Sequence, residues 1–136
     1  MARRGVTLVE LMIVVLILGV LAGIALPTYS RTVERTYRQE AQDILYAVYQ
    51  GERSYYLTNN AYFGPLTDTS SMSEWRTIYM DNPNLGSIPV TFTVGVPGAG
   101  TFSATATRVG GRCAGHTVTI DQGRTLGGTW PSSGDC

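Results

Sequence analysis

The feature that most constrains this chain is a block of sixteen residues, Leu11–Leu26, in which every residue is apolar or glycine. Counted from Gly5, the segment has 22 residues and would measure about 33 Å as a helix, against a hydrocarbon core of about 30 Å. A helix of that length can cross a membrane. Because Arg3 and Arg4 precede the block, we expect the N-terminus to lie in the cytoplasm and the residues after Pro27 to lie outside.

A secretory signal peptide has the same basic start and apolar run, and Gly23 and Ala25 supply small residues of the kind found near a cleavage position. Glu10 argues against that interpretation, because an acid at the centre of a membrane helix costs on the order of 2.5–3.5 kcal/mol, and less toward the interface. Such a carboxylate needs a cationic partner. No base follows within the chain until Arg31, so we expect the partner to come from another molecule or from the chain's own N-terminal amine.

The residues from Gly5 to Val15, Gly-Val-Thr-Leu-Val-Glu-Leu-Met-Ile-Val-Val, resemble the N-terminus of type IV pilins and pseudopilins, the type IV filament superfamily. The resemblance implies that a prepilin peptidase cleaves after Gly5 and methylates the new amine of Val6, where most members of the family carry Phe. It also implies that Glu10 pairs with the N-terminal amine of a neighbouring subunit during assembly. Pro27 falls where the helix of this family bends.

The same resemblance divides the chain into a leader peptide over residues 1–5, a transmembrane or filament-core helix over 6–27 and a globular head over 28–136. The partners it implies are further copies of the chain in a helical filament, the prepilin peptidase, the inner-membrane pilus assembly machinery and, before assembly, membrane lipid. We expect a single-pass protein of the inner membrane that later forms an extracellular pilus. The filament would serve adhesion, twitching motility or DNA uptake, with DNA or a host surface as its target.

Two other functions are compatible with the same anchor. A pseudopilin of a type II secretion system would build a short periplasmic filament, and long surface filaments would exclude it. A membrane-anchored periplasmic binding protein would never polymerise. That second alternative predicts that Glu10→Ala leaves function intact, whereas a filament subunit would lose assembly.

The charge composition excludes several classes of function. Ten acidic residues balance ten basic residues, and every basic residue is Arg, so the chain has no lysine for a phosphate-binding loop or a Schiff base. Cleavage after Gly5 would leave eight bases against ten acids and the α-amine of Val6 as the only amine. This is not the composition of a strongly basic nucleic-acid binder. An assembled array could still cluster the scattered bases outside, which include Arg53, Arg76, Arg108, Arg112 and Arg124.

Beyond Pro27 the apolar residues recur every three or four positions, which predicts an amphipathic helix over residues 28–54. We expect it to continue the apolar segment as one helix from about residue 6, bent near Pro27. Charged residues should lie on the solvent side, with Glu34 and Arg38 as an i,i+4 ion pair. The apolar face should pack on the core of the head, and it carries Tyr29, Val33, Tyr37, Ala41, Ile44, Leu45, Val48 and Tyr49.

Residues 57–89 are rich in Asn, Gly, Pro and Ser, so we expect a loop with a short helix near residues 71–76 that carries surface function or subunit contacts. Polar and apolar residues then alternate over 90–94, 102–107 and 116–120, with Gly-rich segments between them, which predicts an antiparallel meander with one buried face. The expected fold class is therefore α+β, a long bent N-terminal helix packed on a small antiparallel β-meander, with a Cys-bounded loop at its end.

The two cysteines, Cys113 and Cys136, form an even count in a domain that we expect to be exported, which favours a disulfide worth about 3–4 kcal/mol. In type IV pilins a disulfide bounds a C-terminal loop, and these two positions resemble that pair. The alternative is a metal site made of Cys113, His116, Asp135 and Cys136.

No pattern in the sequence points to catalysis, and we expect neither an enzyme nor a bound cofactor or metal. The chain has a single His and lacks both a nucleophile elbow and a Gly-rich phosphate loop after a strand. Asp121 and Asp135 are candidates for a calcium site, but acidic residues in turns are more often solvated. We expect Trp130 to cover the core of the head rather than to touch a receptor.

Overall fold

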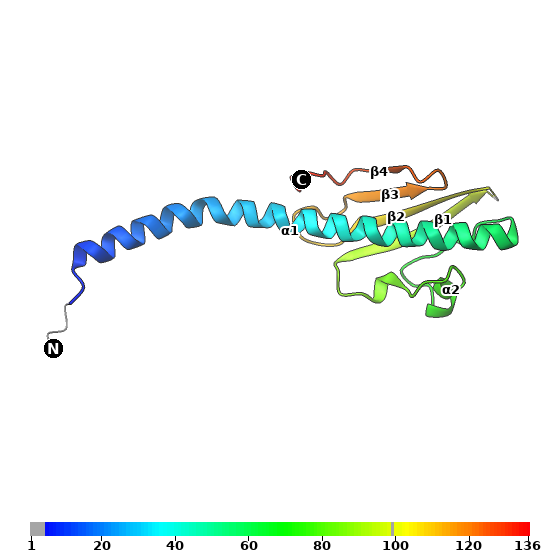
Figure 1. Cartoon of the computed structure of the whole chain (residues 1–136), viewed down its shortest axis with the longest axis horizontal. Coiled ribbons are helices and arrows are strands. Elements are labelled where there is room, and N and C mark those ends of the chain that lie inside the picture. The colour runs from blue at the N-terminus through cyan, green and yellow to red at the C-terminus, as the bar shows by residue number, and fades with distance from the viewer. Residues whose placement is uncertain (1–4, 99) are drawn as a thin grey trace.

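The computed structural model describes residues 5–98 and 100–136. A long helix, α1 (Leu8–Asn59), projects freely in its N-terminal half and forms a head with a sheet in its C-terminal half (Figure 1). Of the expected leader only Gly5 is described, and Arg3 and Arg4 lie outside the described residues. The other elements are α2 (Met72–Arg76), the 3-10 helix η1 (Pro83–Leu85) and the strands β1 (Val90–Gly98), β2 (Thr101–Arg108), β3 (Thr117–Asp121) and β4 (Leu126–Gly128).

Helix α1 is continuous through its proline, and its ribbon curves in the N-terminal half (Figure 1). It begins slightly later than expected, because Thr7 caps its first turn. It also continues past Ser54, where the sequence pattern ends, because Tyr56 stacks on Tyr62 with ring centroids 4.6 Å apart. Asn60 ends the helix with a φ of 55°, a left-handed conformation that Asn tolerates.

The four strands pair antiparallel in the order β1-β2-β3-β4, which confirms the expected meander. Phe92, Ala106 and Val118 lie side by side across the first three strands and are buried. The sequence does not predict β4, because two of its three residues are glycine and show no alternation. Gly128 has a φ of 112°, and a Cβ there would collide with the carbonyl oxygen of Thr117, so glycine is required for β4 to approach β3.

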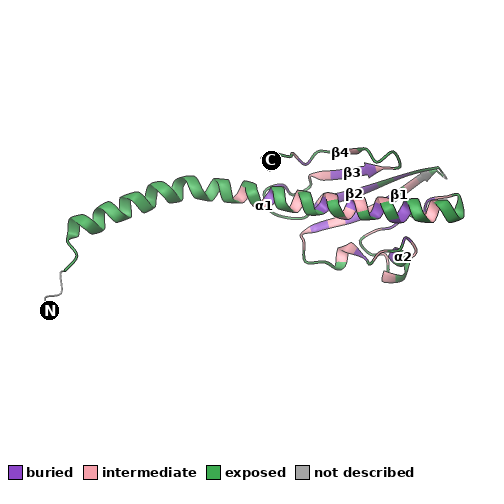
Figure 2. Ribbon diagram, in the orientation of Figure 1, coloured by how far each residue is buried: buried purple, intermediate pink, exposed green. Residues whose placement is uncertain are grey.

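The core lies between α1 and the sheet. Figure 2 shows buried residues along the head half of α1 and on the strands beside it, whereas the other half of the helix is exposed throughout. Ala41, Leu45 and Val48 are fully buried, which confirms the predicted apolar face. Tyr29 was predicted on that face but is 71% exposed, because it precedes the part of α1 that the sheet covers.

The segment between α1 and β1 belongs to the core more than its composition predicts. α2 confirms the expected short helix, and Trp75 and Ile78 are fully buried. Leu66 forms an isolated bridge with Val94 and extends the edge of β1. Gly51 of α1 lies against the carbonyl oxygen of Ile78 with no room for a Cβ. The segment is therefore fixed to the head by both backbone and side-chain contacts.

Candidate functional site

The first residues of α1 form a capping box around an acid. One carboxylate oxygen of Glu10 accepts hydrogen bonds from the N–H (3.1 Å) and the hydroxyl (3.0 Å) of Thr7, and that hydroxyl oxygen accepts from the N–H of Glu10 (3.3 Å). No ion pair to Glu10 forms among residues 5–98 and 100–136. Gly5 and Val6 precede the helix and are exposed, so the peptide bond between them lies outside helical structure.

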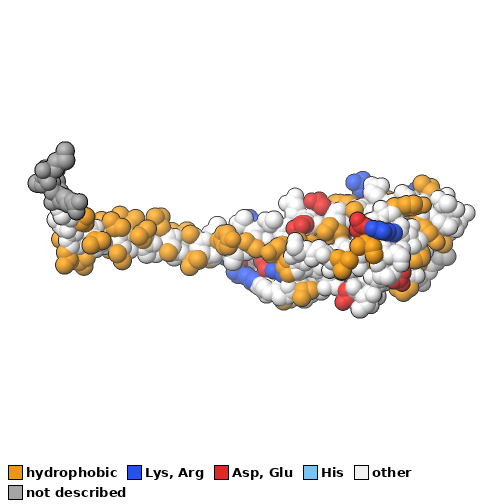
Figure 3. All heavy atoms as spheres, turned by 90° about the horizontal axis from the view of Figure 1, so that it is seen from below, with side chains coloured by type: hydrophobic (Ala, Val, Ile, Leu, Met, Phe, Trp, Pro, Cys, Tyr) orange, Lys and Arg blue, Asp and Glu red, His pale blue; other side chains and the backbone are white. Residues whose placement is uncertain are grey.

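The free half of α1 presents a continuous apolar surface. Hydrophobic side chains cover its visible face in the space-filling view (Figure 3). Its large apolar side chains between Leu8 and Leu26 are 50–74% exposed. In the described part of the chain, α1 is the one helix long and apolar enough to cross a membrane, and its most apolar window has no buried residue. A surface of this kind needs lipid or other helices around it.

Small residues and a proline interrupt this surface. Pro27 lacks the N–H that would bond the carbonyl of Gly23. The hydroxyl of Thr28 donates to the carbonyl oxygen of Ile24 at 3.0 Å. The carbonyl next to that of Gly23 thus accepts a second hydrogen bond, from a side chain. Apart from the neighbouring backbone of α1 itself, no described residue lies within 4 Å of the position that a Cβ would take at Gly19 or Gly23. The two glycines thus leave room for the close approach of another helix.

The head half of α1 holds a buried ion pair that the sequence interpretation missed. Glu34 was predicted to pair with Arg38 at the surface, but it is 4% exposed and accepts hydrogen bonds of 3.0 Å from both Nε and Nη2 of Arg108. Nη1 of Arg108 donates to two backbone carbonyl oxygens, and its guanidinium lies 4.7 Å from the ring centre of Tyr37. Arg108 is therefore enclosed and does not belong with the exposed bases.

The predicted disulfide between Cys113 and Cys136 is formed, and it joins residues 23 positions apart. The alternative metal site is wrong, because both thiols are used by this bond and Nδ1 of His116 lies 2.9 Å from the carbonyl oxygen of Thr129. Across residues 5–98 and 100–136, no three His, Cys, Asp or Glu side chains gather as a metal site would require. Asp121 accepts hydrogen bonds from two N–H groups of its own turn.

Arginines of α1 hold the segment that precedes the last cysteine. Nε of Arg38 donates to the carbonyl oxygen of Trp130 at 2.9 Å, and Nε of Arg35 donates to that of Ser133 at 2.6 Å. Trp130 is buried, as predicted. The sequence interpretation placed both arginines in solvent because local spacing carries no information about a partner more than ninety residues away.

A second acid, Glu52, is fully buried within α1. Its Oε2 accepts a hydrogen bond of 2.9 Å from the N–H of Phe63, while Oε1 has no partner among the described residues. Burial raises the pKa of this carboxyl from 4.5 to about 7. The sequence does contain a signal for it, because Glu52 follows Val48 by four positions and so lies on the apolar face of the helix.

Comparisons with known proteins match both parts of the chain. Residues 27–117 match the family described as "Type IV minor pilin ComP, DNA uptake sequence receptor". Residues 1–26 match the prokaryotic N-terminal methylation motif. The two matches together include the free half of α1 and most of the head.

Several curated proteins are similar over part of the chain. The type IV major pilin protein PilA of Myxococcus xanthus (strain DK1622) is 42% identical over 60 residues, which are 44% of this chain and 27% of PilA. A fimbrial protein of Moraxella nonliquefaciens is 52% identical over 40 residues, 29% of this chain and 26% of that protein. The type II secretion system core protein G of Pectobacterium carotovorum subsp. carotovorum is 38% identical over 60 residues, 44% of this chain and 38% of that protein. The matches span less than half the length of each relative.

Proposed function

The chain belongs to the type IV pilin family, and from this premise we propose that it is a structural subunit that polymerises through the free half of α1 into an extracellular filament. The observation that carries the proposal is the contrast within α1. The head completes its own core, whereas no residue in the most apolar part of the helix is buried. Bilayer lipid would cover this surface before assembly, and the same helix of other copies would cover it afterwards.

We propose that cleavage falls between Gly5 and Val6 and that the amine of Val6 becomes methylated. The exposed, non-helical backbone of these residues supports this assignment, because a peptidase needs a peptide bond that is free of the helix. Cleavage leaves Thr7 in the mature chain, so the capping box would survive processing. Pro27 and Gly23 would set the bend and the closest approach of the helices in the filament core.

Glu10 is the proposed assembly acid. Before assembly, its carboxylate would be satisfied by Thr7 of the same chain, which lowers the cost of keeping an acid in an apolar segment. In the filament, the Val6 amine of a neighbouring subunit would pair with the same carboxylate. One buried charge pair among uniformly apolar helices selects a single stagger between them.

For the use of the filament we propose DNA uptake, ahead of adhesion or twitching motility, because the head matches the ComP family. Arg53 and Arg124 are exposed and form no ion pair within the described residues, so they are free to contact phosphate. Arg124 also lies 5.3 Å from the ring centre of Tyr46. A pseudopilin role is the second candidate, supported by the similarity to core protein G.

An intact mass from whole cells, with and without reductant, tests the processing steps together. We expect a species that begins at Val6, carries one added methyl group and gains two hydrogens on reduction. A chain that begins after Ala25 would identify a plain signal peptide and overturn the proposal. Purified surface filaments containing the chain would support the pilin role, whereas its presence only in short periplasmic filaments would support the pseudopilin role.

DNA binding by those filaments tests the proposed use. Filaments with Arg53→Gln and Arg124→Gln should bind duplex DNA more weakly than wild type. The slope of log affinity against log salt should fall by about 1 for each lost phosphate contact. Equal binding and an equal slope would remove these two arginines from the DNA contact.

A further inference from the structure

Four arginines meet at the end of the head that adjoins the free half of α1. Arg31, Arg35 and Arg38 follow one another at helical spacing on α1, and Arg112 lies on the connection between β2 and β3. We call these four residues the basic collar. Both the β2–β3 connection and the C-terminal segment lie at this end of the sheet, beside the point where α1 leaves the head (Figure 1).

The collar carries more positive charge than its partners remove. Nε of Arg31 lies 2.7 Å from Oδ1 of Asp135, and Nη2 of Arg112 lies 3.6 Å from the same oxygen, so one carboxylate serves two guanidinium groups. Arg35 and Arg38 donate to backbone carbonyl oxygens, which leaves their charges intact. Side chains alone therefore give the collar three net positive charges.

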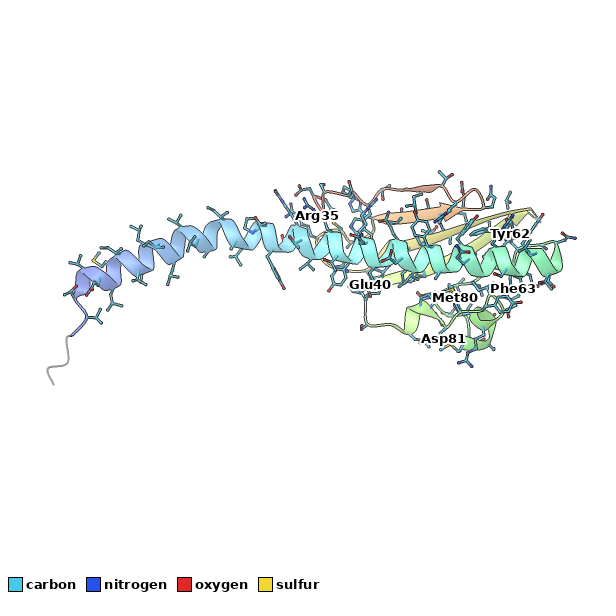
Figure 4. All side chains as sticks on the ribbon, viewed as in Figure 1. Arg35, Glu40, Tyr62, Phe63, Met80 and Asp81 are labelled. Carbon is cyan, nitrogen blue, oxygen red and sulfur yellow. A yellow bond between two sulfur atoms is a disulfide. The ribbon has the colours of Figure 1, made fainter. Side chains whose placement is uncertain are left out.

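Nearby acids do not cancel this charge. Glu34 is used by the buried pair with Arg108. Glu40 and Arg35 project on different sides of α1 (Figure 4), as expected for residues five positions apart on a helix. Arg31, Arg112 and Asp135 are each between two-fifths and one-half exposed, so the cluster faces solvent instead of filling the core.

The collar also lies at the right height for the polar surface of a bilayer. Arg31 follows Leu26, the last residue of the apolar block, by five positions, or about 7.5 Å along the helix. The headgroup region beyond the hydrocarbon edge is about 5–7 Å deep on each side. Side chains of a helix lean toward its N-terminus, which here is the direction of the membrane. Arg31 can reach headgroup phosphates directly, and Arg35, four positions or about 6 Å farther along the helix, lies within one Debye length of it.

This placement is the opposite of what membrane orientation alone would favour. Cationic residues near a membrane helix favour the cytoplasmic side, yet three arginines follow the apolar block within twelve residues on the side expected to lie outside. Two of them hold the C-terminal segment through carbonyl oxygens. Among residues 5–98 and 100–136, Arg31 and Arg112 have no such contact, and they share one acid between them. Their excess charge is left for a partner outside the chain.

We propose that the basic collar binds anionic phospholipid headgroups of the outer leaflet while the subunit waits in the membrane, and so holds the head down on the bilayer. The proposal rests on the membrane anchoring proposed above. Guanidinium groups suit this partner because they bind phosphate oxygens through paired N–H donors. The binding is reversible and sensitive to salt, as a subunit that must leave the membrane for a filament requires.

The test uses the full chain reconstituted in phosphatidylcholine vesicles that contain trace spin-labelled lipids. Electron spin resonance gives the association of labelled phosphatidylglycerol relative to labelled phosphatidylcholine. We expect a preference of about fivefold for the anionic lipid from one effective charge near the surface. Arg31→Gln with Arg112→Gln should lower this ratio toward one, and the corresponding Lys variants should restore most of the wild-type preference.

The matched control is Arg53→Gln with Arg124→Gln, which removes two charges from exposed arginines outside the collar and should leave the ratio unchanged. Asp135→Asn separates lipid binding from a purely structural role. It removes a salt-bridge acceptor but raises the collar's charge, so the preference should increase. A ratio near one in the wild type, or no increase with Asp135→Asn in a chain that keeps its disulfide, would overturn the proposal.

Two further outcomes have distinct meanings. If the chain fails to float with the vesicles at all, the membrane anchoring is wrong, and the collar proposal falls with it. If duplex DNA abolishes the lipid preference, and the collar variant rather than the Arg53 and Arg124 variant loses DNA binding, the collar is a nucleic-acid surface. That result would overturn its assignment to lipid.

Discussion

The two halves of α1 are built from one continuous backbone but depend on different surroundings. In the head half, apolar residues recur on one face and are buried against a sheet, while arginines on another face hold the C-terminal segment. In the free half, apolar residues occupy every face and none is buried within the chain. The head therefore completes its packing as a monomer, whereas the free half reaches a stable environment only in lipid or among other helices.

The largest expected effect comes from the one acid in the free half. Glu10→Ala should abolish surface filaments almost completely, because neighbouring helices would lose the charge pair that fixes their stagger. The head should stay folded and the chain should stay in the membrane fraction, since neither depends on Glu10. Counting filaments by electron microscopy and quantifying the membrane-bound chain would measure both results.

Glu40→Ala is the matched control, because it removes an exposed acid from the head half of the same helix. It should leave filament number unchanged. Normal filaments with Glu10→Ala would contradict the assembly role of the free half of α1, which would then serve only as a membrane anchor. The membrane-anchored binding protein would become the better interpretation.

The next effect concerns the head alone. Arg108→Met leaves the buried carboxylate of Glu34 without a partner and should lower the free energy of unfolding by about 3–5 kcal/mol. Trp75 and Trp130 are both buried in the head, so their fluorescence during urea unfolding in detergent reports on this half specifically.

The exposed pair of Arg76 and Asp81 provides the control for that measurement. Arg76→Met should cost less than about 1 kcal/mol, because two-thirds or more of each side chain is in solvent. Equal effects of the two substitutions would mean that the buried pair contributes no more to the head than a surface contact. Arg108→Met should not change insertion of the free half into vesicles.

The disulfide should contribute slightly less to the free energy of unfolding than the buried pair of Glu34 and Arg108. Replacing Cys113 and Cys136 with Ser should lower the free energy of unfolding by about 3–4 kcal/mol on the chain-entropy argument for a loop of this length. The same fluorescence assay measures the loss, and reduced wild type should unfold at the same urea concentration as the double variant. A loss below about 1 kcal/mol would show that the arginine contacts fix the C-terminal segment without the covalent bond.

The smallest effect is a dependence on pH. The pKa of Glu52 is raised to about 7 in the folded chain from 4.5, so its contribution to stability is complete below pH 4.5 and is lost as the pH rises to about 7. At full ionisation the loss is about 3 kcal/mol. Glu52→Gln should remove this slope and make the head more stable than wild type at pH 8.

Glu74→Gln is the control for that pH series. Glu74 is exposed, and the hydrogen bond from the N–H of Ser71 lowers the pKa of its carboxyl, so it contributes nothing to a slope between pH 4.5 and 7. If the Glu52 variant kept the wild-type slope, another group in the head would be responsible. Urea unfolding at several pH values between 4 and 8 distinguishes the two results.

The sequence predicts the parts of the molecule that depend on local periodicity. The continuous apolar block, the amphipathic spacing around Leu45 and the alternation around Phe92 are all confirmed in the fold. The residues missed are those whose partners lie far along the chain. Glu34 meets Arg108 from 74 positions away, and nothing in the local helical pattern distinguishes it from a solvated acid. Among the residues proposed to act in assembly, the structure describes the hydrogen bonds between Glu10 and Thr7. The pairing of Glu10 with a neighbouring subunit stays a prediction.

The contacts of Arg35 and Arg38 have a consequence for how the head can evolve. Both arginines hold the C-terminal segment by backbone carbonyl oxygens, which every residue type provides. The exposed side chains on that segment, such as those of Ser132 and Ser133, can therefore change without loss of this attachment, while the disulfide fixes the end of the segment. Substitutions at these exposed positions can therefore accumulate and diversify this part of the outer surface rapidly, while the fold of the head stays the same.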